Sequence, residues 1–334
     1  MSSLSEPLES AQARRYGVIV AWARRNAWTL GLVAFLVILL AFTKLIQPKY
    51  GPVPIQGLAT AVFPLALAAV AQAVVVISGG IDLSIGSMMA LTSVIAATAM
   101  DGRSPEFAVA VVIGVLFIGL VLGAVNGALV VITLVPDIVV TLAMAFVWAG
   151  CALLVRAAPG GSAVPWLKDL VIGPLGNEWL PKAAVVLVLI VAAIWIPVRR
   201  SRLGLSFYAI GSNRLAAFRS GVSVGRTRFF SYVLTGLFSA LAGLSLTAST
   251  GIGTPVPGPY TLMSVAAVVL GGVSLAGGRG GVFGPIVAVM ILSLLQTDIT
   301  LVGVNPNLAT VLQGAMLIGV LMLGSITQFR RGRR

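Results

Sequence analysis

The sequence predicts an all-α fold, a polytopic membrane helix bundle with about ten transmembrane helices. Of the 334 residues, 58% are hydrophobic and only 9% are charged, and the mean hydropathy is +1.06. A water-soluble domain could not keep that much apolar surface away from solvent, because much of any globular surface stays exposed. About ten apolar stretches approach the roughly 20 residues that a helix needs to cross about 30 Å of hydrocarbon.

The predicted spans follow one another along most of the chain. The first is too long for the core of a signal peptide, and no cleavage site of small residues follows it. The transmembrane domain covers residues 27–328, with an N-terminal segment of residues 1–26 and a tail of residues 329–334. In order, the predicted spans are residues 27–46, 57–78, 84–100, 107–134, 138–157, 183–198, 229–250, 262–277, 282–300 and 309–328.

The arginines indicate the orientation of the chain in the membrane. They cluster before the first span, in the loop of residues 199–228 and in the tail. Because cytoplasmic segments are enriched in Lys and Arg, we expect all three regions, and therefore both termini, to be cytoplasmic. An even number of spans also requires both termini to lie on the same side of the membrane. The net charge of +13 then comes from cytoplasmic segments that flank spans in membrane lipid, and it does not indicate nucleic acid as a partner.

The longest predicted outer segment, residues 159–182, is expected to form an ordered cap on the membrane surface. It is rich in proline and glycine, which break a regular span. Its residues Trp166 and Trp179 are of the type that gathers at membrane interfaces. A disordered loop is the alternative.

The residue types that carry most enzyme chemistry are scarce. The sequence has no histidine, and Cys151 is its only cysteine. A histidine base, a disulfide within the chain and a thiolate metal site are therefore excluded or implausible. The sequence predicts a protein that is not an enzyme and that needs no cofactor or metal.

A glycine-rich segment, Ser78–Ser87, separates the second and third predicted spans. Gly79 and Gly80 favour a break in the helix, and the carboxylate of Asp82 is costly at the edge of the hydrocarbon. In one interpretation, Asp82 or Ser84 caps the next helix. In a second, compatible interpretation, the broken helix also exposes polar groups to a solute pathway.

A second glycine-rich break spans Leu270–Gly281 and begins like the first, with Gly271 and Gly272 followed by Ser274 in place of the aspartate. Corresponding breaks in two halves of a transporter indicate a pathway. The segment lacks the lysine and hydroxyl of a nucleotide-binding loop, so we do not interpret it as a phosphate site.

Two further motifs concern packing and docking. Gly123 and Gly127 form a G-x-x-x-G pair, which predicts tight packing between helices. In the central basic loop, Ser212 or Asn213 can start a short helix that Gly221 ends. This helix either docks into a groove on another protein or lies amphipathically on the membrane surface.

Together these segments resemble the permease family of bacterial ATP-binding-cassette importers for ribose, xylose, galactose and related sugars, which is allied to branched-chain amino acid permeases. The resemblance is carried by the Gly79–Ser87 run, by Asn126-Gly127 followed by Thr141-Leu142, by the Gly211–Gly221 loop and by the Gly271–Gly281 region. These segments occur in one order, with the expected spans between them.

The resemblance implies a type II importer-like permease in the bacterial inner membrane, with no ATPase site of its own. It implies three partners: a cytoplasmic ATP-binding-cassette ATPase, an extracytoplasmic sugar-binding protein and a second permease subunit. The expected function is import of a small polar solute, a monosaccharide, by alternating access. An ion-coupled secondary transporter that uses Asp82 and Asp298 is the alternative.

The resemblance also implies two sets of site residues. The loop that resembles the ATPase-coupling helix contains Gly211, Asn213, Arg214, Ala216, Ala217, Phe218, Arg219, Ser220 and Gly221. The candidate translocation pathway contains Gly79, Gly80, Asp82, Ser84, Asn126, Thr141, Gly271, Gly272 and Ser274.

Overall fold

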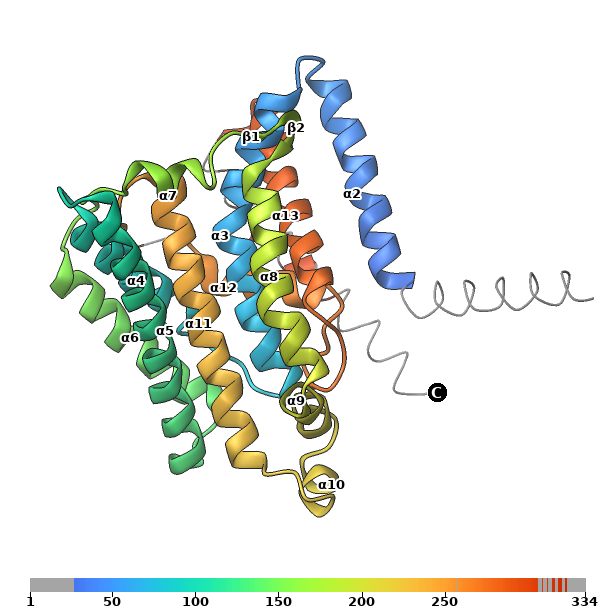
Figure 1. Ribbon diagram of the computed structural model, residues 1–334. Coiled ribbons are helices and arrows are strands. Elements are labelled where there is room, and N and C mark those ends of the chain that lie inside the picture. The colour runs from blue at the N-terminus through green and yellow to red at the C-terminus, as the bar shows by residue number, and fades with distance from the viewer. Residues whose placement is uncertain are drawn as a thin grey trace, which may run out of the picture.

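The computed structural model describes residues 27–256 and 258–305, with a few isolated positions between residues 308 and 322. In this part of the chain, long helices lie side by side in one bundle (Figure 1). Seven of the described helices are long and apolar enough to cross a membrane, so the chain is a polytopic helical membrane protein. They are α2 (Ala27–Ile46), α3 (Pro52–Ile77), α5 (Pro105–Thr133), α6 (Asp137–Val155), α8 (Lys182–Arg200), α11 (Val224–Thr250) and α13 (Phe283–Leu301).

Two shorter apolar helices, α4 (Ile85–Met100) and α12 (Tyr260–Leu270), complete the described bundle. The predicted span 262–277 is wrong in its second half, because the helix ends at Gly271 and Gly272 adopts a positive φ of +80°. Glycine adopts a positive φ without steric cost, and a residue in this conformation interrupts a regular helix. The predicted span 309–328 lies largely outside the described residues, and residues 1–26 and 329–334 lie wholly outside them. A count of ten spans therefore stays a prediction.

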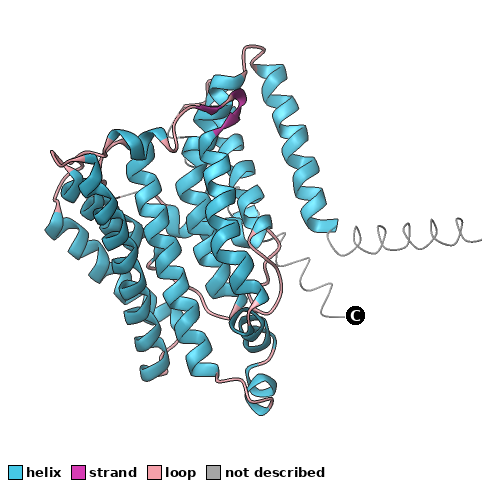
Figure 2. Ribbon diagram, viewed as in Figure 1, coloured by secondary structure: helices cyan, strands magenta, loops and turns pink. Residues whose placement is uncertain are grey.

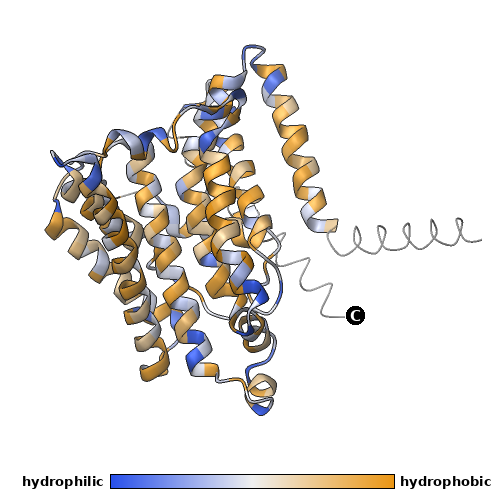
Figure 3. Cartoon of the chain, in the orientation of Figure 1, coloured by the Kyte–Doolittle hydropathy of each residue, from blue (hydrophilic) through white to orange (hydrophobic). Residues whose placement is uncertain are grey.

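Helix α3 lies at the centre of the bundle. Its residues from Val62 to Ile77 are all buried, because the helix is apolar on every side and carries no charge. It packs against α8, α11, α12 and α13. The outer helices α5, α6 and α8 instead leave many apolar side chains exposed, as a lipid-facing surface requires. Hydrophilic residues gather at the two ends of the bundle (Figure 3).

Helices α5 and α11 cross at very short range through glycine. A Cβ atom at Gly236 would lie 2.7 Å from the backbone nitrogen of Gly123 and would overlap the carbonyl oxygen of Gly119. Gly127 likewise faces the backbone of Phe229. The predicted packing role of the Gly123 and Gly127 pair is confirmed.

The segment between α6 and α8 is an ordered cap, so the disordered alternative is wrong for these described residues. It contains the short helix α7 (Pro165–Asp169) and two antiparallel strands, β1 (Pro174–Leu175) and β2 (Asn177–Pro181), which add a small β element to the expected all-α fold (Figure 2). Paired backbone hydrogen bonds between Gly160 and Gly253, of 3.0 and 2.9 Å, tie the cap to the segment after α11.

The basic loop of residues 199–228 is mostly helical and lies at the end of the bundle opposite the strands (Figure 1). It contains α9 (Arg202–Ser212) and α10 (Arg214–Arg219), and α11 begins before the predicted residue 229. The side chain of Asn213 accepts the N–H of Ala216 (2.9 Å), and Gly221 has a φ of +82°. The predicted start of the short helix at Asn213 is confirmed, as is its end before Gly221.

The glycine contact between α5 and α11 makes a testable prediction. A Gly236→Val substitution forces the two backbones apart and should lower the thermal unfolding midpoint of the detergent-extracted protein by about 3 °C or more. The matched control is Gly114→Val, also on a membrane helix but with no atom within 4 Å of the added Cβ. Equal midpoints for the two variants would contradict the assignment.

Candidate functional site

Three segments that are far apart in the sequence meet at the C-terminal end of α3. The N–H of Gly278 donates to the carbonyl oxygen of Ile77 (2.9 Å), and Arg214 Nη2 donates to the carbonyl oxygen of Gly79 (2.8 Å). We use the name glycine junction for residues 77–79, 211–212 and 277–278, together with the side chain of Arg214. It joins the end of the central helix, the end of α9 and the loop after α12.

Side chains are excluded from the centre of the glycine junction. A Cβ atom at Gly211 would overlap the carbonyl oxygen of Ile77 and the backbone nitrogen of Gly278. A Cβ atom at Gly277 would lie 2.9 Å from the Cα atoms of both Gly211 and Gly79, and Gly277 has a φ of +87°. Only glycine permits backbones to approach this closely in this conformation. The three segments are therefore in direct backbone contact at Gly79, Gly211 and Gly277.

A tyrosine on α9 adds a second link to the loop after α12. The hydroxyl of Tyr208 donates to the carbonyl oxygen of Gly280 (3.0 Å). Burial raises the pKa of Tyr208 above its ordinary value, and nearby Arg199 lowers it by less. The phenol therefore stays protonated and remains a donor at neutral pH.

The break after α3 leads into a buried polar network. Asp82 Oδ1 accepts the N–H of Ser84 (2.8 Å) and the hydroxyl of Ser84 (2.6 Å). Asn126 Nδ2 donates to Ser84 Oγ (2.7 Å), and Trp148 Nε1 donates to Asn126 Oδ1 (3.2 Å). The structure thus brings the predicted residues Asp82, Ser84 and Asn126 together. Trp148 was missed, because nothing in an apolar span marks one tryptophan as a hydrogen-bond donor.

The predicted capping role of these residues is wrong. Ser84 is the N-cap residue of α4, but its side chain makes no cap hydrogen bond. The Ser84 hydroxyl is used between Asp82 and Asn126 instead, and Asp82 accepts from Ser84 rather than from the first turn of the helix. Asp82 Oδ2 is buried and has no hydrogen-bond partner among the residues described. An unpaired buried acceptor costs about 1–3 kcal/mol, so a structural cap does not explain this carboxylate.

The start of α6 fixes the other side of the break. Thr141 Oγ1 accepts the N–H of Leu83 (3.1 Å) and donates to the carbonyl oxygen of Asp137 (2.8 Å). Asp137 forms an ion pair with Arg228, and its Oδ2 accepts the hydroxyl of Tyr232 (2.8 Å). The predicted residue Thr141 therefore joins the cluster. Nothing in the sequence indicated that Asp137 and Arg228, which lie on different helices, form a pair.

Gly80 is held by the same cluster. A Cβ atom there would lie 2.6 Å from Asp137 Oδ2 and 3.0 Å from the hydroxyl oxygen of Tyr232. Only glycine therefore fits at position 80, where the chain passes between α6 and α11.

The predicted residues of the second break do not join this cluster. Gly271 packs against the backbone of Gly284, and Gly272 lies against the indole of Trp28. Ser274 forms backbone hydrogen bonds within its own loop. Its carbonyl oxygen accepts the N–H of Gly277 (2.9 Å), and its N–H donates to the carbonyl oxygen of Arg279 (3.1 Å). The second break instead reaches the first one through Gly277 and Gly278.

The predicted coupling residues form an exposed end of the molecule. Ala217 is buried against its own chain, whereas Phe218 is 67% exposed and Leu215 is 58% exposed. The exposed residues on this surface come from one helical turn and its flanks: Ser212, Asn213, Arg214, Leu215, Ala216, Phe218, Arg219, Ser220 and Gly221.

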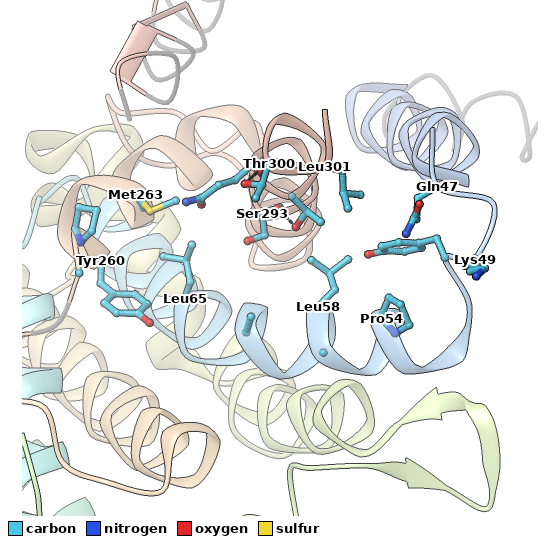
Figure 4. Close-up of a pocket in the computed structure, with 17 residues that line it drawn as sticks. Gln47, Lys49, Pro54, Leu58, Leu65, Tyr260, Met263, Ser293, Thr300 and Leu301 are labelled. Carbon is cyan, nitrogen blue, oxygen red and sulfur yellow. Dashed lines mark hydrogen bonds between the residues drawn. The ribbon is translucent and has the colours of Figure 1, made fainter. Parts of the chain in front are cut away.

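A cavity of about 660 Å³ lies far from the glycine junction, toward the N-terminal end of α3. Leu58 and Leu65 on α3 lie across it from Ser293 and Thr300 on α13, and Tyr260 is at one end (Figure 4). None of the predicted pathway residues lines this cavity. One sequence feature could have indicated this cavity: the row of polar residues in the predicted apolar span 282–300, which corresponds to α13.

Comparisons with known proteins point to one family. A family model described as branched-chain amino acid transport system / permease component matches residues 55–321. The probable ABC transporter permease protein y4mJ of Sinorhizobium fredii is 33% identical over 274 residues, which are 80% of each chain. The ribose import permease protein RbsC of Escherichia coli K12 is 33% identical over 260 residues, 76% of this chain and 79% of that protein. The autoinducer 2 import system permease protein LsrD of Photorhabdus laumondii is 30% identical over 304 residues, 88% of this chain and 90% of that protein. No solved structure matches significantly.

The packing at the glycine junction predicts that one added methyl group destabilises the protein at Gly211 but not at Gly150. Gly211→Ala should lower the thermal unfolding midpoint of the detergent-extracted protein, because the added Cβ overlaps two backbones that cannot move independently. Gly150→Ala is the control, since its Cβ meets no atom within 4 Å and alanine favours a helix. A Gly211→Ala midpoint at or above that of Gly150→Ala would show that the junction is loosely packed.

Proposed function

The chain belongs to the family of branched-chain amino acid transport system permease components, and we propose that it is the membrane-spanning subunit of an ATP-binding-cassette importer for a monosaccharide. Two relatives named as import permeases, one for ribose and one for autoinducer 2, support a sugar-like solute. In this proposal the chain lies in a bacterial inner membrane with ten spans, a type II importer-like arrangement and both termini in the cytoplasm. Its partners are an ATPase, an extracytoplasmic binding protein and a second permease subunit.

The glycine junction is the observation that supports this function most. The exposed turn of α10 follows α9 after one residue, and the end of α9 touches the end of α3 through Gly211. We propose that α10 docks into the ATPase in the cytoplasm. A movement of α10 on ATP binding would then reach the central helix directly, because the backbones of the three segments touch one another in the junction.

In this proposal the first break forms the inner part of the solute pathway. Gly79, Gly80, Asp82, Ser84 and Thr141 surround it together with Asn126, and the unpaired Oδ2 of Asp82 is available to a solute or to water. Gly271, Gly272 and Ser274 act at a distance, by placing the loop that carries Gly277 and Gly278 against this break.

The ion-coupled alternative is not favoured. It requires Asp82 and Asp298 to carry an ion, whereas two of the matched relatives are named as import permease proteins and a third as a probable ABC transporter permease protein. Asp82 belongs to the break after α3 and Asp298 to α13, which does not contribute to the network around Asp82.

The docking proposal is tested by the amount of ATPase that stays bound to a tagged permease during purification. Ala216→Trp places a large ring on the exposed side of α10 and should reduce the bound ATPase about tenfold, a change of about 1.4 kcal/mol in binding. Ala217 is unsuitable, because it is buried against its own chain.

Ala143→Trp is the matched control, since Ala143 is an exposed alanine on the membrane helix α6. It should leave the bound ATPase unchanged. Undiminished ATPase on the Ala216→Trp protein would overturn the assignment of α10 as the coupling helix.

A further inference from the structure

We infer that the cavity between α3, α12 and α13 is a binding site for the transported solute, that it takes a neutral polyhydroxylated compound, and that Gln72 is the next hydrogen-bonding contact deeper in the bundle. The inference rests on the proposed function and deepens it, since neither the relatives nor the predicted pathway residues identify a solute site. Its size, about 660 Å³, lies within the range of about 300–1,000 Å³ that small-molecule sites occupy.

Uncharged hydrogen-bonding groups line the cavity on the α13 side. Ser293, Gln296, Thr297 and Thr300 all face it, which places them on one side of the helix. The hydroxyls of Thr297 and Thr300 donate within the helix, to the carbonyl oxygens of Ser293 and Gln296 (both 2.9 Å). Their oxygen lone pairs stay available as acceptors, and the Gln296 amide can both donate and accept. Such a row suits a ligand that carries several hydroxyl groups.

The rest of the wall supplies apolar and aromatic surface. Leu58 and Leu65 on α3 lie opposite the polar row, and Met263 and Tyr260 on α12 close one end (Figure 4). A sugar presents C–H groups on its ring as well as hydroxyls at its edge, so a cavity with one apolar wall and one polar wall matches both kinds of surface.

The charges around the cavity disfavour an amino acid. A zwitterion would bring an ammonium and a carboxylate, and each needs a counter-charge when it leaves water. Lys49 is the one charged residue that lines the cavity among those described, and no carboxylate does. The acid on α13, Asp298, does not line the cavity; it is buried next to Thr43 of α2 and near Tyr50, which does line it. A neutral solute avoids this cost.

Gln72 lies deeper in the bundle than the cavity, on the same helix as two residues that line it. Leu58, Leu65 and Gln72 are each seven residues apart on α3, so they share one face of the helix. At 1.5 Å per residue, Gln72 lies about 10 Å beyond Leu65 in the direction of the glycine junction. It is fully buried, and neither its amide oxygen nor its amide nitrogen has a hydrogen-bond partner in the described part of the chain. A passing solute hydroxyl would provide the missing partner.

The test uses the complete complex, with its ATPase and binding protein, in proteoliposomes. ATP-driven uptake is measured for radiolabelled D-ribose, D-xylose, D-galactose and ribitol, and for L-leucine as a zwitterion. We expect uptake of at least one neutral compound and none of leucine. Uptake of leucine alone would overturn the inferred solute class, whereas no ATP-driven uptake of any compound would count against the proposed function itself.

Two variants locate the contacts for whichever neutral compound is taken up. Gln296→Leu should raise the KM of uptake about tenfold, which corresponds to about 1.4 kcal/mol of lost interaction. Gln72→Leu should lower the maximal rate several-fold with little change in KM, because this contact lies beyond the first site. The same Gln72→Leu change should raise the thermal unfolding midpoint, since it removes an unpaired buried amide, and this shows that the variant is folded.

Gln56→Leu is the control, since Gln56 lies on α3 outside the cavity lining and bonds the carbonyl oxygen of Glu178 (2.7 Å). It should leave KM and maximal rate unchanged. Unaltered kinetics in both Gln296→Leu and Gln72→Leu would overturn the site while leaving the proposed function intact.

Discussion

The structure depends on a contact made mainly by backbone, where the end of the central helix α3 meets the end of α9 and the loop after α12. The last carbonyl groups of any helix lack partners within it, and in a membrane such groups cannot be left unpaired. Here the carbonyl oxygens of Ile77 and Gly79 are satisfied by Gly278 and Arg214. This arrangement allows α3 to stop inside the bundle, and it requires glycine at position 211.

The surroundings of the break are held by side chains that act in two groups. The network of Asp82, Ser84 and Asn126 ties the break to α4 and α5, and the ion pair of Asp137 and Arg228 ties α6 to α11. Both groups contact the break between α3 and α4. In the proposed function, a movement of α9 and α10 is therefore transmitted along α3 toward the cavity near the N-terminal end of that helix.

Much of the fold could be predicted, because a run of about 20 apolar residues has few alternatives to a membrane helix. The same criterion was wrong for residues 262–277, since a hydropathy pattern does not register that Gly271 and Gly272 end α12. Asn213 was identified from local capping chemistry, and Asn126 and Thr141 from the family resemblance. The partners Trp148, Arg228 and Tyr232 and the cavity were missed, because they depend on which helices become neighbours. That arrangement is a property of the packed bundle and not of any one segment.

The central claim is that the glycine junction connects the ATPase-facing loop to the solute cavity. It is tested most directly by the reactivity of a Thr297→Cys side chain, in a chain carrying Cys151→Ser, toward a membrane-impermeant maleimide in the assembled complex. The account predicts that a non-hydrolysable ATP analogue changes the labelling rate several-fold, that Arg214→Ala abolishes this change in complexes that still contain the bound ATPase, and that Arg202→Ala, outside the junction, preserves it. A nucleotide effect that survives Arg214→Ala, or no effect in the chain with an intact junction, would contradict the account.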